Sequence, residues 1–242
     1  MFIRVLAATA FCLSLTPALA QTPAAPDRAA IERIVRDYLL QNPEVLVEAM
    51  NELRRRQELA AGEASKQAIG EYKKELFEDA ASPVGGNAKG DVTLVEFFDY
   101  HCGYCKQVHE PMLSLMREDK NLRVVYKEMP ILAPESRIAA AGALAAQKQG
   151  KYVEMHNALM SARGKLTKDR VLALAKEQKL DVARLEKDME TPEIQGAIDR
   201  NLKLAQAIGV DGTPAFIIGD QFAPGALPIE QLREMVAQAR KK

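Results

Sequence analysis

Cys102 and Cys105 are separated by two residues, a spacing that allows two thiols to react with each other and with a disulfide. The 242-residue chain has one further cysteine, Cys12, which lies in an apolar N-terminal stretch. A disulfide across two intervening residues closes a very small loop, so loop-closure entropy predicts that it adds little stability. The pair is therefore better explained by redox chemistry than by structural support.

The position of the pair in the chain indicates how the two thiols differ. Residues 92–98 are β-branched and aromatic and predict a buried strand, and residues 106–119 predict the helix that follows. We expect Cys102 at the start of this helix, where unpaired backbone N–H groups and the helix dipole stabilise a thiolate. Cys102 is then the nucleophile and leaving group, and the more buried Cys105 resolves the mixed disulfide.

A metal site is the alternative interpretation of these thiols. Cys102 and Cys105 with His109 offer three ligands, and His101 or His156 offers a fourth, which is the donor set of a structural zinc site. No second cysteine pair exists in the sequence, and thiolate sites in an oxidising compartment tend to oxidise. We therefore predict no resident metal and no other cofactor, with Cu(I) binding to the reduced pair as a side activity.

The first twenty residues have the pattern of a secretory signal peptide. A start with one positive charge, Met1–Arg4, precedes the apolar run Val5–Leu15, and small residues follow as far as Ala20. A buried or membrane-anchoring helix is the alternative, but the run is short for a span of about 20 residues. We expect cleavage after Ala20 and export to the periplasm.

Charge composition bears on the class of partner. The chain has 33 basic and 33 acidic residues, so its formal net charge is zero. This balance gives no indication of a nucleic-acid partner, because nucleic-acid binding proteins carry a basic excess.

The segment at residues 21–80 predicts helices that need a partner. After a lead-in at residues 21–26, apolar residues recur three or four apart and then seven apart, with Pro43 between the two patterns. They are Ile31, Ile34, Val35 and Tyr38 in a first helix that Asp27 can cap, and Leu46, Leu53 and Ala60 in a second. Such a stripe cannot bury a core by itself. It packs either on the rest of the chain or, as we favour, on the same segment of another subunit.

The remaining chain, residues 81–242, predicts an α/β fold with an inserted helical subdomain. A turn-rich stretch at residues 81–90 marks a boundary, and strands are expected at residues 92–98, 122–129 and 215–219. Helical patterns fill about residues 133–208, and a last helix covers residues 228–239.

A family resemblance rests on residues 94–105, LVEFFDYHCGYC, and on Gly212-Thr213-Pro214. The first stretch resembles the active-site strand and helix start of the DsbA-like thioredoxin-fold proteins, and the second is similar to their cis-proline loop. The similarity extends over residues 91–242, and residues 27–46 resemble the N-terminal segment of the ScsC branch. The resemblance implies a thioredoxin fold with an inserted helical subdomain, preceded by a helical oligomerisation segment.

The resemblance also implies roles for residues around the cysteines. Pro214 is expected to be cis beside Cys102, with the backbone of Thr213 pairing with the substrate chain. Glu96 lies on an otherwise apolar strand, so burial should raise its pKa and let it relay protons to Cys105; an outward-facing side chain is the alternative.

Five further residues in or near the motif have expected roles. Tyr104 is expected to tune the pair and contact substrate, together with its neighbour Gly103. A protonated His101 would add positive charge beside the sulfur. Lys106 and His109, on the helix, are expected to be solvated.

The direction of the redox reaction is the last expectation. The Gly103-Tyr104 dipeptide and Thr213 are similar to the disulfide isomerase DsbC, and some ScsC members form trimers through the N-terminal segment. We therefore expect a disulfide isomerase or reductase that acts on disulfide-containing exported clients, is kept reduced by a membrane redox partner and forms a homo-oligomer, with a trimer favoured. A DsbA-type oxidase and a copper-sequestering protein are the alternatives.

Overall fold

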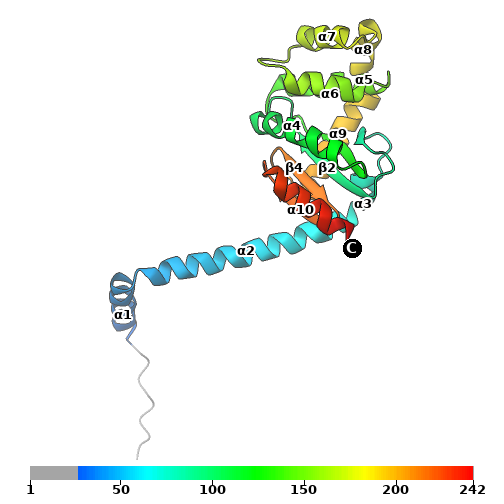
Figure 1. Ribbon diagram of the computed structural model, residues 1–242. Coiled ribbons are helices and arrows are strands. Elements are labelled where there is room, and N and C mark those ends of the chain that lie inside the picture. Colours follow the sequence, from blue (N-terminus) through cyan, green and yellow to red (C-terminus); the bar gives the residue numbers. More distant parts are fainter. Residues whose placement is uncertain (1–26, 242) are drawn as a thin grey trace, which may run out of the picture. The chain divides into compact units, whose positions relative to one another are not determined.

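The computed structural model describes residues 27–241, and these form two compact units that divide between Arg55 and Arg56 (Figure 1). The predicted signal peptide at residues 1–20 and the lead-in at residues 21–26 lie outside the described residues. None of the helices within residues 27–241 is long and apolar enough to cross a membrane. Each unit is described by itself below.

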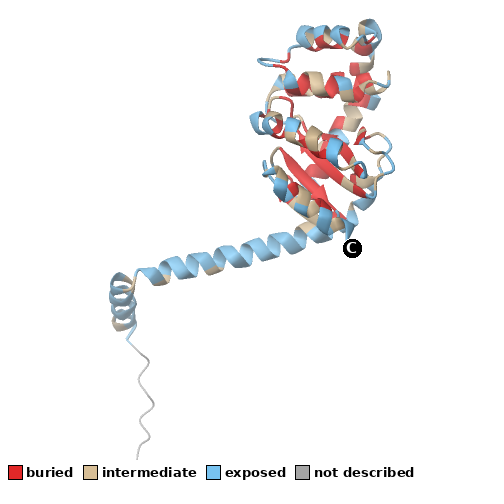
Figure 2. Cartoon of the chain, viewed as in Figure 1, coloured by how far each residue is buried: buried red, intermediate tan, exposed pale blue. Residues whose placement is uncertain are grey.

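The first unit contains helix α1 (Arg28–Gln41) and the first part of helix α2 (Glu44–Glu71). The carboxylate of Asp27 accepts a hydrogen bond from the backbone N–H of Ala29 and caps α1, as predicted. Figure 2 shows both helical pieces as almost wholly exposed. Exposed large apolar side chains follow one another along them: Ile31, Ile34, Val35, Tyr38, Leu40, Leu46, Val47, Met50 and Leu53.

The second unit is built on a five-stranded sheet with the order β1-β3-β2-β4-β5. Strands β2 and β3 are parallel, and the other neighbours are antiparallel. The strands are β1 (Val84–Gly86), β2 (Val92–Phe98), β3 (Leu122–Glu128), β4 (Ala215–Ile218) and β5 (Gln221–Pro224). The sequence predicts the three inner strands but not β1 and β5. Both edge strands are short. The sequence predicts only turns where β1 lies, and β1 becomes a strand because it pairs with β3.

The two faces of the sheet have separate apolar cores. Leu94 and Phe98 belong to one cluster, with residues of α4 (Gly103–Glu118) and α10 (Ile229–Arg240). Val95 and Phe97 belong to the other, which α3 (Lys73–Phe77) and the end of α9 (Pro192–Ala207) share. Because side chains alternate along a strand, Glu96 lies on the same face as Leu94 and Phe98.

The end of the predicted N-terminal segment also belongs to this second core. Ile69, near the end of α2, and Leu76 in α3 are buried among the side chains of the sheet. Residues 56–80 are therefore part of the sheet-bearing unit, whereas the sequence boundary was expected at residue 80.

The helical subdomain stands between β3 and β4, where the insertion at about residues 133–208 is predicted. Figure 1 shows its helices as a stacked block in green and yellow. They are α5 (Pro134–Gln147), α6 (Tyr152–Ser161), α7 (Lys168–Glu177), α8 (Val182–Met189) and the start of α9. The central helix α5 is Ala-rich and buried, and a Cβ atom on Gly142 would lie 2.5 Å from Val171 Cγ1. Small side chains therefore allow the close packing of this block.

Candidate active site

Cys102 occupies the N-cap position of α4, directly after the carboxyl end of β2. The backbone N–H of Cys105 donates to the Cys102 sulfur, with 3.3 Å between nitrogen and sulfur. Unpaired N–H groups and the positive end of the dipole lie at this helix start, so negative charge on the sulfur is stabilised there. The prediction that Cys102 begins the helix is confirmed, although α4 starts at Gly103 rather than at residue 106.

Cys105 lies one turn into α4 and is fully buried in the core. Burial raises the pKa of its thiol well above the ordinary value, and the nearby Glu96 carboxyl adds to this effect. The Cys105 thiol therefore keeps its proton until a base removes it. Cys102 is also buried, with 4% of its surface exposed against 0% for Cys105, so the two thiols differ in burial less than the sequence predicts.

The loop that ends in Pro214 lies beside the sulfur of Cys102 in space. The peptide bond between Thr213 and Pro214 is cis, as predicted. The Cys102 Sγ lies 3.2 Å from the carbonyl oxygen of Thr213 and donates a hydrogen bond to it. Thr213 Oγ1 is buried and has no hydrogen-bond partner among the described residues. The loop is thus in the position expected for it, while its contact with a substrate chain stays a prediction.

Glu96 is buried in the middle of β2, with 4% of its surface exposed. Desolvation raises the pKa of its carboxyl to about 8, so this group is mostly protonated at neutral pH. The inward-facing position and the raised pKa agree with the prediction, and the outward-facing alternative is wrong. The proton relay to Cys105 stays a prediction.

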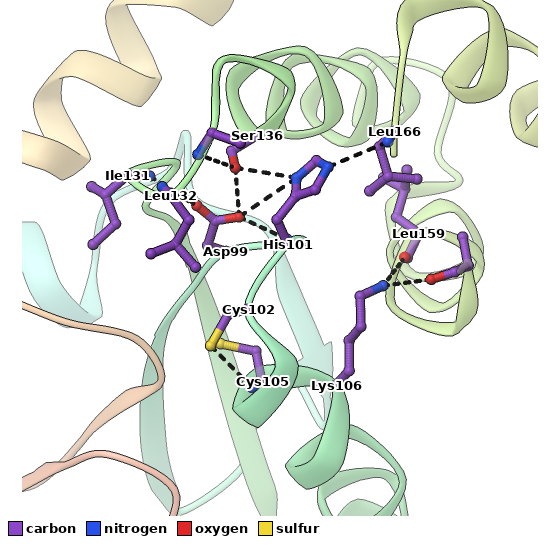
Figure 3. A network of polar contacts seen from close by, with 12 residues as sticks. Asp99, His101, Cys102, Cys105, Lys106, Ile131, Leu132, Ser136, Leu159 and Leu166 are labelled. Atoms are coloured by element: carbon purple, nitrogen blue, oxygen red, sulfur yellow. Dashed lines mark hydrogen bonds and ion pairs between the residues drawn. The ribbon is translucent and has the colours of Figure 1, made fainter. Parts of the chain in front are cut away.

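Asp99 organises the loop before the motif, and the sequence analysis missed it. Its carboxylate accepts hydrogen bonds from the backbone N–H groups of His101, Ile131 and Leu132, at 2.7, 2.8 and 2.9 Å (Figure 3). The Ser136 hydroxyl donates a fourth at 2.8 Å. Four donors compensate the burial of this carboxylate. The one available signal was a polar residue directly after a buried strand.

His101 points toward Ser136 and Leu166, away from the two sulfurs (Figure 3). Its Nε2 accepts a hydrogen bond from the backbone N–H of Leu166 at 3.3 Å, and its Nδ1 lies 3.2 Å from Ser136 Oγ. A nitrogen that accepts carries no proton, so these contacts assign the neutral ring with the proton on Nδ1. In this arrangement the ring gives no positive charge to Cys102.

Lys106 and His109 are not solvated, contrary to the expectation from the sequence. The Lys106 ammonium bonds to backbone carbonyls of the helical block, as detailed below. His109 Nε2 is buried, and its ring lies 5.2 Å from that of His156. Long-range packing of α6 on α4 covers both side chains, and helical periodicity alone does not show this.

Tyr104 and Gly103 lie at the surface beside Cys102. The Tyr104 side chain is 64% exposed, and a Cβ on Gly103 would meet no atom within 4 Å. Ile131 and Leu132, whose backbone Asp99 holds, are also exposed apolar residues. The surface near the sulfur is therefore open and partly apolar, and its contact with substrate stays a prediction.

A second buried polar network ties the sheet to the helical block and has no clear signal in the sequence. The hydroxyls of Tyr100 and Tyr152 donate to Glu128 Oε1 at 3.0 and 2.7 Å, and Tyr100 also lies 3.0 Å from His156 Nδ1. Burial raises the pKa of Glu128 and lowers that of His156, so burial disfavours the charged form of both groups.

Within residues 27–241, no three His, Cys, Asp or Glu side chains are placed to hold a metal ion. His101 and His156, the fourth ligands considered for zinc, have the other partners given above. The arrangement of the site instead offers one thiol at a helix start, one fully buried thiol and a buried carboxyl.

Comparison with known families gives two matches. The model of the DSBA-like thioredoxin domain matches residues 93–237, and the model of the copper resistance protein ScsC N-terminal domain matches residues 27–60. Together they cover most of the described residues.

Two solved structures with similar folds are matched by this chain over almost all of their own length. A thioredoxin-like oxidoreductase from Silicibacter pomeroyi is 46% identical, with a TM-score of 0.68, over 70% of this chain and 98% of that one. A linker-deletion mutant of ScsC from Proteus mirabilis is 27% identical, with a TM-score of 0.68, over 90% and 98% of the two chains.

A curated relative of different length is the Na(+)/H(+) antiporter NhaA 1 of Salinispora arenicola. It is 30% identical over 158 residues, which are 64% of this chain and 24% of the antiporter. The chain thus spans about a quarter of the length of that relative.

Proposed function

Since the chain belongs to the DSBA-like thioredoxin domain family and is a thiol–disulfide oxidoreductase, we propose that it is a disulfide isomerase or reductase for exported proteins in the periplasm. The sequence of residues 1–20 supports export. Cys102 and Cys105 carry the chemistry, and electrons come from thiols, so no cofactor is needed.

The reaction starts at the Cys102 sulfur. Its thiolate attacks one sulfur of a client disulfide, a mixed disulfide forms, and the other client sulfur leaves as a thiolate. In isomerisation a second client thiolate attacks the mixed disulfide and regenerates the Cys102 thiolate. In reduction Cys105 attacks Cys102 instead, the client leaves reduced, and a membrane redox partner later reduces the Cys102–Cys105 disulfide.

Glu96 supports the reduction branch. Cys105 must lose its proton to attack, and its pKa is raised by burial. With a pKa of about 8, a minor fraction of the Glu96 carboxyl is deprotonated at neutral pH, and this fraction can take the proton from the buried thiol and return it later. Tyr104, Gly103 and the backbone of Thr213 form the client-facing surface, with Pro214 shaping the loop.

The observation that carries the isomerase direction is the exposed apolar stripe of the first unit. Nine large apolar side chains between Ile31 and Leu53 are exposed in the chain by itself. Exposed apolar surface of this extent marks an interaction site. The occupant that we propose is the same stripe of other copies, giving a homo-oligomer, with a trimer as the resemblance implies. Several thiolates per oligomer would then face one client, which favours reshuffling.

The test is a pair of assays on the purified protein, with the Cys102–Cys105 pair reduced for the reshuffling assay and oxidised for the disulfide-donation assay. An isomerase restores activity to ribonuclease with scrambled disulfides, whereas an oxidase introduces disulfides into reduced ribonuclease without reshuffling them. Restored activity supports the proposal, and oxidation alone overturns it.

A DsbA-type oxidase is the second candidate function. The geometry that favours it is the helix-start sulfur of Cys102, because a stabilised thiolate is also a good leaving group for donating a disulfide. Copper sequestration is the third candidate, and it is supported by the match of residues 27–60 to a copper resistance protein domain. Cu(I) bound to the two thiols would be released or excluded when the pair is oxidised.

A further inference from the structure

Lys106 joins the active-site helix to the end of a helix in the helical block. It lies in the first turn of α4, next to Cys105, and its ammonium donates to the carbonyl oxygens of Leu159, Met160 and Ala162 at 3.0, 3.0 and 2.7 Å. These carbonyls lie at the end of α6, where the last turn lacks the full set of intrahelical donors, although the Leu159 carbonyl also accepts from the backbone N–H of Ala162. The three donors of the ammonium are all used, and its charge lies at the negative end of the α6 dipole.

His101 reaches the same connection from the other side of the motif. Its Nε2 accepts from the backbone N–H of Leu166, four residues after Ala162 (Figure 3). The connection between α6 and α7, residues 162–167, is therefore bonded at one end to Lys106 and at the other to His101. These two residues directly flank the segment from Cys102 to Cys105 in the sequence.

Between these two ties the connection has few other contacts. Ala162 and Leu166 are buried, while Arg163, Gly164 and Lys165 between them are exposed. Lys165 Nζ lies 3.7 Å from a Glu135 carboxylate oxygen, and its side chain is 81% exposed. An ion pair so exposed holds a loop weakly.

We propose that Lys106 and His101 are positioning residues that hold the connection at residues 162–167 in one conformation beside the dithiol, and that this order sets how well a protein client binds. The proposal rests on the proposed role of Cys102 as the client-facing nucleophile. It holds for isomerisation, reduction and oxidation alike, because each begins with a client lying across Cys102.

The physical reason is conformational entropy. A released connection samples many conformations beside the two residues that flank the cysteines, and a bulky client that reaches this side of the site must order it again on binding. A small disulfide touches little beyond the sulfur and avoids this cost. Loss of the tie should therefore raise KM for a protein client, with a much smaller change in kcat and in the reaction with a small disulfide.

The experiment compares Lys106→Met, Lys106→Arg and wild type as full chains. In Lys106→Met the backbone amides of residues 162–166 should exchange hydrogen about tenfold faster, because the local opening loses its main hydrogen bonds. KM for scrambled or reduced ribonuclease should rise about tenfold, with kcat within about twofold. Lys106→Arg keeps a donor group for the carbonyls and should restore most of both effects.

Lys151→Met is the matched control. Lys151 donates to the carbonyls of Gln178 and Lys179. The variant therefore also removes an ammonium from the end of a helix in the helical block, α7, but away from the cysteines. It should lower thermal stability to a similar degree and leave KM and the exchange of residues 162–166 unchanged. The proposal is overturned if Lys106→Met and Lys151→Met change KM equally, or if Lys106→Met leaves exchange of residues 162–166 as in wild type.

The same experiment separates this proposal from the proposed function. If wild type does not react with glutathione disulfide through Cys102, the role of that thiol is wrong. Another outcome is that wild type reacts while Lys106→Met slows the reactions with glutathione disulfide and with ribonuclease equally. In that case the Lys106 hydrogen bonds act on the thiols themselves, and the proposal is wrong.

Discussion

The sulfur of Cys102 lies 3.2 Å from the carbonyl oxygen of Thr213, although 111 positions separate the two residues. Antiparallel pairing of β2 with β4, in which Phe97 lies opposite Ala215, brings the loop before β4 to the start of α4. The backbone of Thr213 thus stands beside the sulfur, which is where an extended client needs hydrogen-bonding groups.

The two cysteines should differ when either is removed. Cys102→Ala should abolish turnover of both ribonuclease substrates, since no other thiol of the site can begin the exchange. Cys105→Ala should accumulate client as mixed disulfide on Cys102, because the resolving thiol is missing. Non-reducing electrophoresis with mass spectrometry identifies the trapped cysteine, and trapping on Cys105 in the Cys102→Ala variant would reverse the assignment.

Glu96→Gln should slow resolution of the mixed disulfide by Cys105 about a hundredfold near pH 7, the usual loss for a proton-transfer group. The first attack by Cys102 should change far less, because it does not require Cys105 to lose its proton. Stopped-flow measurement of both steps tests this. The matched control is Glu128→Gln, which alters another buried carboxyl, one bonded to Tyr100 and Tyr152. Equal slowing by both variants would mean that the effect is structural.

Glu96 should also make stability depend on pH. Its pKa is about 8 in the folded chain against an ordinary value of 4.5, so between these pH values the folded state binds a proton that the unfolded state has lost. The free energy of unfolding should therefore fall by up to about 1.4 kcal/mol per pH unit from pH 4.5 to 8, and level off above.

Urea unfolding of wild type and Glu96→Gln across that range measures the contribution. The difference in stability should move in favour of Glu96→Gln as the pH rises. Parallel pH curves for the two proteins would show that the carboxyl is not protonated in the folded chain.

The apolar stripe of the first unit should control the oligomeric state. In the full chain, Leu46→Lys combined with Leu53→Lys should convert an oligomer to a monomer, because charge opposes burial of the stripe. The double variant should also lose isomerase activity while keeping dithiol oxidation. Glu48→Lys changes charge on α2 about half a turn away from Leu46 and should leave the mass unchanged. Light scattering after size exclusion decides, and an unchanged mass for the double variant rejects self-association.

A deletion offers a second form of this test, and its end point comes from the structure. Ile69 and Leu76 belong to the core of the sheet-bearing unit, so a deletion should stop at residue 55 rather than at residue 80. Removal of residues 27–55 should give a monomer with an unchanged melting temperature.

Asp99→Asn should destabilise the fold by about 2 kcal/mol, since an amide cannot accept the hydrogen bonds of four donors as a carboxylate does. Asp199→Asn, which removes the surface ion pair with Arg137, should change stability by less than about 1 kcal/mol. Urea unfolding measures both. Equal values would mean that the Asp99 network contributes little.

The sequence by itself determined the class of fold and the reacting thiols. The apolar strand at residues 92–98, the cysteine spacing and the helical pattern that follows are local signals, so they survive without knowledge of tertiary contacts. The helices of the N-terminal segment and the cap at Asp27 are equally local, because capping and periodicity act within a few residues.

The identity of the side chains that surround the thiols depends on tertiary contacts. Edge strand β1 forms by pairing with the distant strand β3, β5 forms as a hairpin with β4, and Asp99 finds three of its four donors more than thirty positions away. The orientation of His101 and the three carbonyls bonded by Lys106 depend on where α6 ends in space. Sequence patterns report periodicity and local hydrogen bonding, whereas these contacts join segments that no local pattern relates. Burial, which sets the pKa of Glu96 and Cys105, is likewise a property of the packed whole.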